Sequence, residues 1–147
     1  MITINVTQKI LAPVEKVNQV LLEHLQLDRF FNAKFTLIKS QNNGELNGGK
    51  GAIRQVSIGT VVFKEEIISA SNEHICYRII GNYPVSAHQG DIQLKSLGVD
   101  NKSTEVNYII KFLGPKWIPP FLLKFIVVSD IRKAMKKLAL HFASEHN

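Results

Sequence analysis

The chain has 147 residues, of which 45% are hydrophobic and 20% are charged, and its formal net charge is +6 at pH 7. This length and composition exclude intrinsic disorder and predict a single domain over residues 1–147 with a core of its own. The one cysteine, Cys76, excludes an internal disulfide, and no stretch is long and apolar enough to span a bilayer. We therefore expect a cytoplasmic protein.

The first part of the chain predicts a strand, two helices and a second strand. Residues 2–11 alternate polar and apolar side chains, many of them β-branched, which is typical of a strand. Pro13 suits the first turn of a helix, and apolar residues at helical spacing extend that helix to about Leu27. The stretch LDRFF predicts a second short helix that Asp28 could cap. KFTLIKSQ predicts a strand, and NNGELNGGKG predicts a loop.

Five more strands and a long helix account for the rest. The strands are expected near residues 51–58, 61–70, 74–81, 85–97 and 103–113, and the helix over about 119–145. An apolar stripe at spacings of three and four residues predicts the inner face of the helix: Phe121, Phe125, Val128, Ile131, Met135, Leu138 and Phe142. Sequential strands favour an antiparallel sheet covered by helices on one face, which is an α+β fold.

Two charged residues fall on the apolar face of a predicted hairpin. A two-residue turn at Gly59-Thr60 would pair Val56 with Phe63 and Arg54 with Glu65. The apolar pairs on this face indicate that it looks inward. A buried charge is costly unless it is paired or partly solvated, so two interpretations are open. The pair either closes the end of a core or lines a cavity, where Arg54 would bind a carboxylate or enolate and Glu65 would hold Arg54 in place.

Alternation in the later strands places more polar side chains on the inner face. The inward candidates are Ile75, Tyr77, Ile79, His88, Gly90, Ile92, Leu94, Val106, Tyr108, Ile110 and Phe112. Each polar member also has a structural interpretation, as a core tyrosine whose hydroxyl reaches water or a satisfied histidine near a strand end. A two-residue turn at Asn72-Glu73 would place Tyr77 opposite Ile68, against this assignment. An odd-length loop would restore it, and a β-bulge would change the parity.

Taken together, these segments resemble the polyketide cyclase/dehydrase and lipid-transport superfamily (SRPBCC), which has the START-related, Bet v 1-like helix-grip fold. The resemblance covers nearly the whole chain and rests on APVEKVNQVL, GKGAIRQV, EEI followed by ICYRIIGNYPV, HQGDIQL, TEVNYIIKF and the long C-terminal helix. GKGAIRQV is similar to the family's Gly-Gly-x-x-Arg strand and places Arg54 on the family arginine. His88 stands where the family more often has tyrosine, and Tyr108 where it often has tryptophan.

The resemblance implies a seven-stranded antiparallel sheet curved around the C-terminal helix, with two short helices between the first two strands. It also implies an apolar cavity that binds hydrophobic or amphipathic small molecules, and in some members catalyses aldol cyclisation or dehydration. The expected ligand-binding residues are Arg54, Phe63, Glu65, Tyr77, His88, Tyr108, Phe125, Ile131 and Met135. The histidines and the cysteine show no metal spacing, so we expect no metal and no cofactor.

Three functions are compatible with these residues. The first is binding or transport of a small hydrophobic or amphipathic ligand, with Arg54 taking an acidic head. The alternative is a cofactor-independent cyclase or dehydratase in which His88 removes a proton, Arg54 stabilises an enolate, and Glu65 orients Arg54 or acts as a base. The third is protein interaction with a collapsed cavity, which an exposed apolar patch around KWIPPF would favour. We expect no nucleic-acid partner, while transient membrane contact and the oligomeric state stay open.

Overall fold

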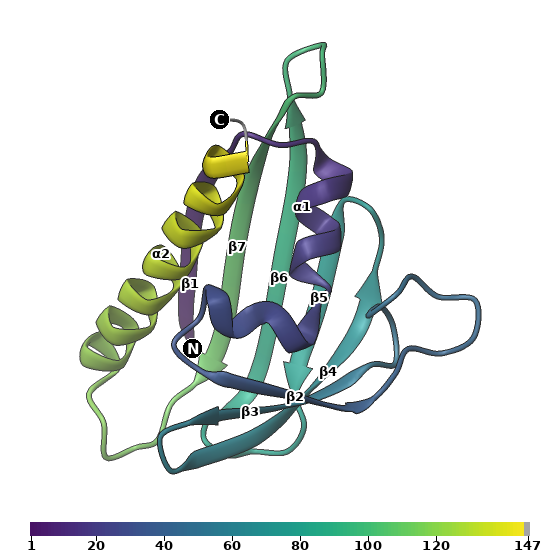
Figure 1. Ribbon diagram of the computed structural model, residues 1–147. Helices are drawn as coiled ribbons and strands as arrows, with labels where there is room; N and C mark the ends of the chain where they lie inside the picture. The colour runs from purple at the N-terminus through teal and green to yellow at the C-terminus, as the bar shows by residue number, and fades with distance from the viewer. Residues whose placement is uncertain (146–147) are drawn as a thin grey trace.

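The computed structural model describes residues 1–145, which form a seven-stranded sheet and three helical segments (Figure 1). The strands are β1 (Ile2–Ile10), β2 (Lys34–Lys39), β3 (Ile53–Ile58), β4 (Val61–Ala70), β5 (His74–Ile79), β6 (Ser86–Leu97) and β7 (Ser103–Leu113). The helices are α1 (Val14–Leu21), the short 3₁₀ helix η1 (His24–Arg29) and α2 (Pro120–Glu145). No helix among the described residues is long and apolar enough to cross a membrane.

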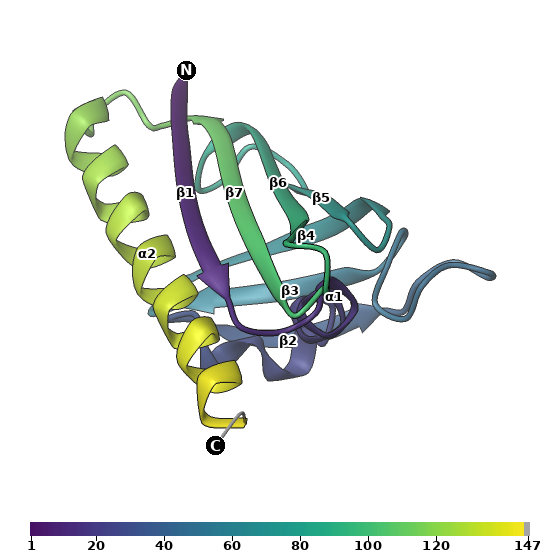
Figure 2. The same cartoon turned by 90° about the horizontal axis from the view of Figure 1, so that it is seen from above.

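The sheet is antiparallel and has the strand order β1-β7-β6-β5-β4-β3-β2. It bends strongly, so that β2, β3 and β4 run across the direction of β1 and β7 (Figure 2). The long helix α2 lies along β1, α1 contacts β6 and β7, and η1 contacts β2. This arrangement confirms the predicted α+β helix-grip fold, with its seven-stranded sheet and two short helices between the first two strands.

The core lies between the concave face of the sheet and the second half of α2. Along β1 and β7 the buried residues alternate with exposed or half-buried ones, and the register places Val6 opposite Tyr108 and Ile4 opposite Ile110. From the helix, Ile131, Met135, Leu138 and Phe142 are buried against this face. Because each fully buried side chain of this size contributes about 1.5–3 kcal/mol, this half of α2 is firmly held.

Two predicted features of the helices are wrong. The first helix ends at Leu21 rather than near Leu27, because the chain turns out of the helical conformation at Glu23 and buries His24 against the loop carbonyl of Gly48. The second helix begins at His24, so Asp28 lies inside it and does not cap it. A tertiary contact has therefore overridden the local helical pattern here.

The predicted stripe on the last helix is correct only in its second half. Phe121 is 77% exposed and Phe125 is 71% exposed. Leu123 and Val127 pack against the core instead, because they continue the spacing of four residues that leads to buried Ile131. The first turns of α2 therefore present their two phenylalanines to solvent.

The hairpins show how side-chain parity is set. The pairing of Arg54 with Glu65 across the turn at Gly59-Thr60 is confirmed. The following turn also has two residues, since Ser71 N–H bonds to the carbonyl of His74, and Ala70 lies opposite Ile75. A register shift between Ile67 and Ser69 then places Tyr77 opposite Ile67. A β-bulge, rather than an odd-length loop, keeps Tyr77 on the inner face.

Candidate functional site

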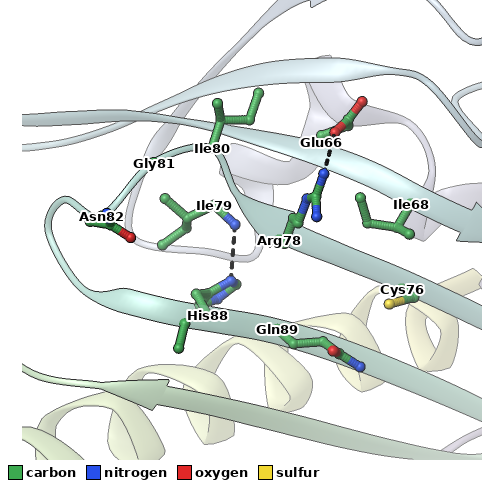
Figure 3. A pocket seen from close by; sticks show the side chains of 11 residues that line it. Glu66, Ile68, Cys76, Arg78, Ile79, Ile80, Gly81, Asn82, His88 and Gln89 are labelled. Atoms are coloured by element: carbon green, nitrogen blue, oxygen red, sulfur yellow. Dashed lines mark hydrogen bonds and ion pairs between the residues drawn. The ribbon is translucent and has the colours of Figure 1, made fainter.

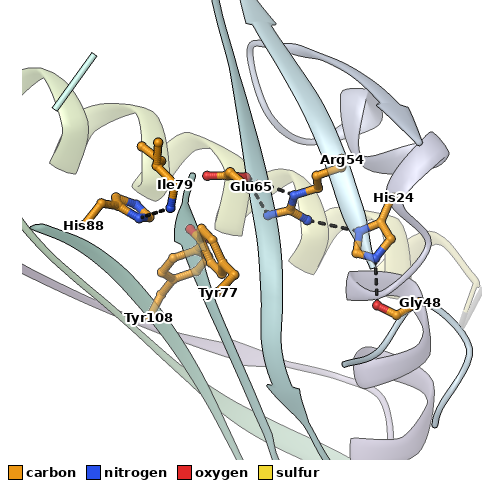
Figure 4. A network of polar contacts seen from close by, with 8 residues as sticks. All are labelled: His24, Gly48, Arg54, Glu65, Tyr77, Ile79, His88 and Tyr108. Carbon is orange, nitrogen blue, oxygen red and sulfur yellow. Dashed lines mark hydrogen bonds and ion pairs between the residues drawn. The ribbon is translucent and has the colours of Figure 1, made fainter. Parts of the chain in front are cut away.

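A cavity of about 830 Å³ lies inside the curl of the sheet and reaches the first half of α2. Its wall is mostly apolar and includes Val56, Phe63, Ile110, Phe112, Ile126 and Ile131. The polar side chains of Arg54, Glu65, Tyr77, His88 and Tyr108 lie close together on this wall (Figure 4). We call these five residues the polar end of the cavity.

Arg54 and Glu65 form a buried ion pair at the polar end. The Nε and Nη2 atoms of Arg54 both lie 2.9 Å from Oε1 of Glu65, and each residue is only 7% exposed. Burial alone would lower the pKa of Arg54, but the Glu65 carboxylate raises it, so the guanidinium stays charged. Its centre also lies 5.0 Å from the ring of Tyr77 and 5.4 Å from the ring of Phe35, which adds cation–π attraction.

His24 holds the other side of the guanidinium and was missed by the sequence analysis. Its Nδ1 lies 3.1 Å from Nη1 of Arg54, and its Nε2 lies 2.7 Å from the carbonyl oxygen of Gly48. A guanidinium can only donate, so Nδ1 accepts and Nε2 donates to Gly48, which defines one neutral tautomer. Burial and then the Arg54 charge lower the pKa of His24 to about 4. His24 is thus a neutral anchor that positions Arg54.

His88 lies where the ladder between β5 and β6 stops. The pairs between these two strands end at Tyr77 and Gly90. On the other side of β6, its pairing with β7 has a register shift between Ser86 and Gln89, where Ala87 has a positive φ of 51°. The N–H of Ile79 donates to Nδ1 of His88 over 3.1 Å (Figures 3 and 4). The side chain therefore accepts a hydrogen bond that a neighbouring strand would otherwise accept.

This contact determines what His88 can do chemically. Because Nδ1 accepts from the backbone, the proton of the neutral ring is on Nε2. Burial lowers the pKa of His88, and nearby Glu65 raises it only in part, so the neutral form is favoured. The ring thus carries an N–H donor on Nε2, and its lone pair on Nδ1 is already engaged. This geometry argues against the predicted role of His88 as a general base.

Tyr77 and Tyr108 hydrogen-bond to each other through their hydroxyls. Burial raises the pKa of Tyr108 to about 12 and that of Tyr77 well above its usual range, so both are neutral. One hydroxyl donates to the other, which leaves one hydroxyl proton for a ligand. Gly90 makes this arrangement possible, because a Cβ there would lie 2.4 Å from the Tyr77 ring.

The predicted site residues are only partly brought together. Those that line the cavity are Arg54, Phe63, Glu65, Tyr77, His88, Tyr108 and Ile131. Phe125 does not line the cavity, because it lies on the solvent side of α2. Met135 is fully buried in the core and is not part of the cavity wall. No local pattern marks His24, which reaches the site only through the fold.

A second hollow of about 580 Å³ lies near the outer surface of the sheet (Figure 3). This hollow and the inner cavity share three lining residues, Ile79, Asn82 and His88, so His88 lies in the wall between them.

Other reactive groups offer little chemistry. Burial raises the pKa of the Cys76 thiol in the second hollow to about 11, which makes this thiol a poor nucleophile. Among residues 1–145, no group of three or more His, Cys, Asp or Glu side chains is arranged to hold a metal ion.

Similarity to known proteins is seen in structure rather than in sequence. No protein-family model matches the chain, and no curated protein matches it significantly. A START superfamily protein from Mycobacterium smegmatis superposes with a TM-score of 0.81 at 12% identity, covering 97% of each chain. The protein XoxI from Bacillus cereus has a TM-score of 0.75 at 16% identity, covering 100% of this chain and 99% of its own. A Thermobifida fusca protein has a TM-score of 0.74 at 15% identity, with coverages of 98% and 95%.

Proposed function

We propose that this chain, which has the START/Bet v 1-like helix-grip fold, binds a small amphipathic molecule in the cavity between the sheet and α2. The observation that carries the proposal is the cavity itself: about 830 Å³, with a mostly apolar wall and its polar groups gathered together. Small-molecule sites have this size and this distribution of polarity. The apolar part of the ligand would supply most of the affinity by leaving water.

We further propose that the ligand carries a neutral polar head. The charge of Arg54 is already balanced by Glu65, and His24, His88 and both tyrosines are neutral. An anionic head would meet no uncompensated positive charge and would lie near the Glu65 carboxylate, which is unfavourable at low dielectric. This revises the expectation that Arg54 takes an acidic head.

The hydrogen-bonding groups at the polar end favour a hydroxyl or carbonyl head. A carbonyl oxygen can accept from the Nε2–H of His88 or from the free tyrosine hydroxyl proton. A hydroxyl can in addition donate to Glu65, because both Arg54 contacts go to Oε1 and, within residues 1–145, Oε2 has no hydrogen bond. A ligand of this kind would leave no buried charge unpaired.

The cyclase or dehydratase alternative receives less support from this geometry. The lone pair of His88 is engaged by Ile79, so Oε2 of Glu65 is the remaining candidate base at the polar end. That carboxylate is already engaged as the counterion of Arg54, which is a structural role. Binding or transport without chemistry therefore needs fewer assumptions.

The proposal is tested by displacing a neutral fluorescent probe, N-phenyl-1-naphthylamine, with matched ligands of equal chain length. Dodecanol and methyl decyl ketone should displace it at concentrations about tenfold lower than dodecanoate at pH 7, because burying an unpaired carboxylate is costly. His88→Leu should reduce the preference for the ketone. The matched control is His74→Leu, since His74 bonds to Asp91 away from the cavity. Tighter binding of dodecanoate would overturn the neutral head, and no probe binding would overturn the site.

A further inference from the structure

The first turns of α2 and the loop before them expose large apolar side chains. Trp117 is 82% exposed, Phe121 77% and Phe125 71%, and Leu122 and Ile126 are also exposed. We call these five residues the apolar end. Apart from Lys124, residues 121–128 are apolar on every side of the helix. A helix segment of that kind is normally covered on all sides, yet here only Leu123, Val127 and Val128 pack against the core.

The apolar end lies beside the solvent-exposed part of the cavity wall, which forms the mouth of the cavity. Trp117 and Ile126 belong both to the apolar end and to the cavity wall. Exposed Tyr83, from the loop between β5 and β6, and Leu113, at the end of β7, line the cavity beside them. In Figure 1 the first turns of α2, the loop after β7 and the loop between β5 and β6 lie at the same end of the molecule. Whatever covers the apolar end therefore also faces the cavity mouth.

The charges around the apolar end are mostly positive. Between Glu105 and Asp130 the chain carries three lysines and no acidic residue. Two of them, Lys116 and Lys124, are exposed next to the aromatic residues. Asp130, which lies on the cavity rim, is followed by Arg132 and Lys133. A partner that binds the apolar end should therefore have an apolar interior and a negatively charged surface.

An anionic lipid surface has both properties. Tryptophan and phenylalanine insert at the boundary between head groups and acyl chains, and flanking lysines are attracted to anionic lipids. A second copy of the chain fits less well, because a two-fold contact would set the exposed lysines of one copy close to those of the other.

We propose that the apolar end docks on an anionic lipid surface and thereby places the mouth of the cavity against the bilayer. The contact is peripheral, since Trp117 and the first two turns of α2 enter the interface while the sheet stays outside. The proposal goes beyond ligand binding and does not depend on the identity of the ligand. An apolar molecule would then pass from the bilayer into the cavity at this end without crossing water.

The chain carries its own reporter, because Trp117 is its only tryptophan. The protein is mixed with vesicles of phosphatidylcholine alone and with vesicles of phosphatidylcholine and phosphatidylglycerol in equal parts. With the anionic vesicles we expect a blue shift of the tryptophan emission and co-sedimentation of the protein. With the neutral vesicles both effects should be several-fold weaker and insensitive to salt.

Variants separate the apolar contribution from the charge. Phe121→Ser/Phe125→Ser should lower partitioning into anionic vesicles by about tenfold or more, and Lys116→Gln/Lys124→Gln by about fivefold for each lysine removed. The matched control is Leu140→Ser, which removes a 68% exposed side chain from the far half of the same helix and should change nothing. Circular dichroism checks that each variant is folded.

Three results would overturn the proposal. One is no binding of the wild-type protein to either vesicle, and another is an equal loss of binding in Leu140→Ser. The third is concentration-dependent dimerisation that Phe121→Ser/Phe125→Ser abolishes in a protein that ignores vesicles, which would assign the apolar end to a second copy. Probe displacement without vesicles should be unchanged in this double variant, because neither phenylalanine lines the cavity. Failure of docking and failure of ligand binding are thus distinguishable.

Discussion

The two ends of the cavity depart from the usual distribution of side chains in opposite ways. At the polar end a charged pair is buried, and at the apolar end three aromatic side chains are exposed. The polar end is satisfied from within the chain, since His24, Glu65 and two aromatic rings surround Arg54. Within the described residues, nothing covers the aromatic side chains of the apolar end. A buried charge that is paired within the chain stabilises the fold itself. An uncovered apolar surface is instead typical of a site that contacts another molecule.

The largest expected effect comes from breaking the pair at the polar end. Glu65→Ala should lower the free energy of unfolding by about 3–5 kcal/mol, because it leaves the Arg54 charge buried without its counterion. The measurement is urea unfolding. Glu66→Ala is the matched control on the next residue of the same strand. Its ion pair with Arg78 spans 3.6 Å at the surface, so it should cost less than about 1 kcal/mol. Similar losses in the two variants would contradict the difference in burial.

A smaller effect, set by His24, should appear as a dependence of stability on pH. Its pKa falls from 6.5 to about 4 on folding, so the unfolded chain takes up the proton first as the pH decreases. The His24 contribution is fully present above pH 6.5 and is lost progressively down to about pH 4, with a total of about 3 kcal/mol. Urea unfolding over this range measures it.

The variant His24→Gln isolates that contribution from the titration of carboxylates. A glutamine amide can accept from Arg54 and donate to Gly48 without titrating. The difference between wild type and variant should therefore shrink as the pH falls. A difference that stays constant between pH 7 and pH 4 would mean that His24 is not the titrating group.

The smallest effect is expected at the apolar end. Phe125→Ala should change the free energy of unfolding by less than about 0.5 kcal/mol, since the side chain is 71% exposed. Met135→Ala, on the same helix but fully buried, should cost about 2–5 kcal/mol. Thermal or urea unfolding compares the two. A large loss for Phe125→Ala would show that the chain itself covers this residue in solution.

Much of the fold follows from patterns that are local in the chain. The seven strands, the pairing of Arg54 with Glu65, and the long last helix were predicted from alternation, turn glycine and helical spacing. The polar end was predicted in part, because alternation places Tyr77, His88 and Tyr108 on the inner face. The same spacing argument misplaced Phe125, since helical periodicity does not say where along its length a helix leaves the core. Met135 faces inward as the stripe predicts, but it lies in the core and not on the cavity wall.

By itself the sequence determined the elements, the register of the hairpin at Gly59-Thr60 and most of the strand residues that face inward, because these follow from side-chain alternation and a recognisable turn. Only the tertiary structure decided that a β-bulge places Tyr77 on the inner face and that His24 hydrogen-bonds to Arg54. It also decided that the backbone N–H of Ile79 selects the tautomer of His88, and that the first turns of α2 stay uncovered. The bulge and the end of the β5–β6 ladder have no signature in the sequence pattern, and the contact of His24 with Arg54 joins elements that meet only once the sheet has curved.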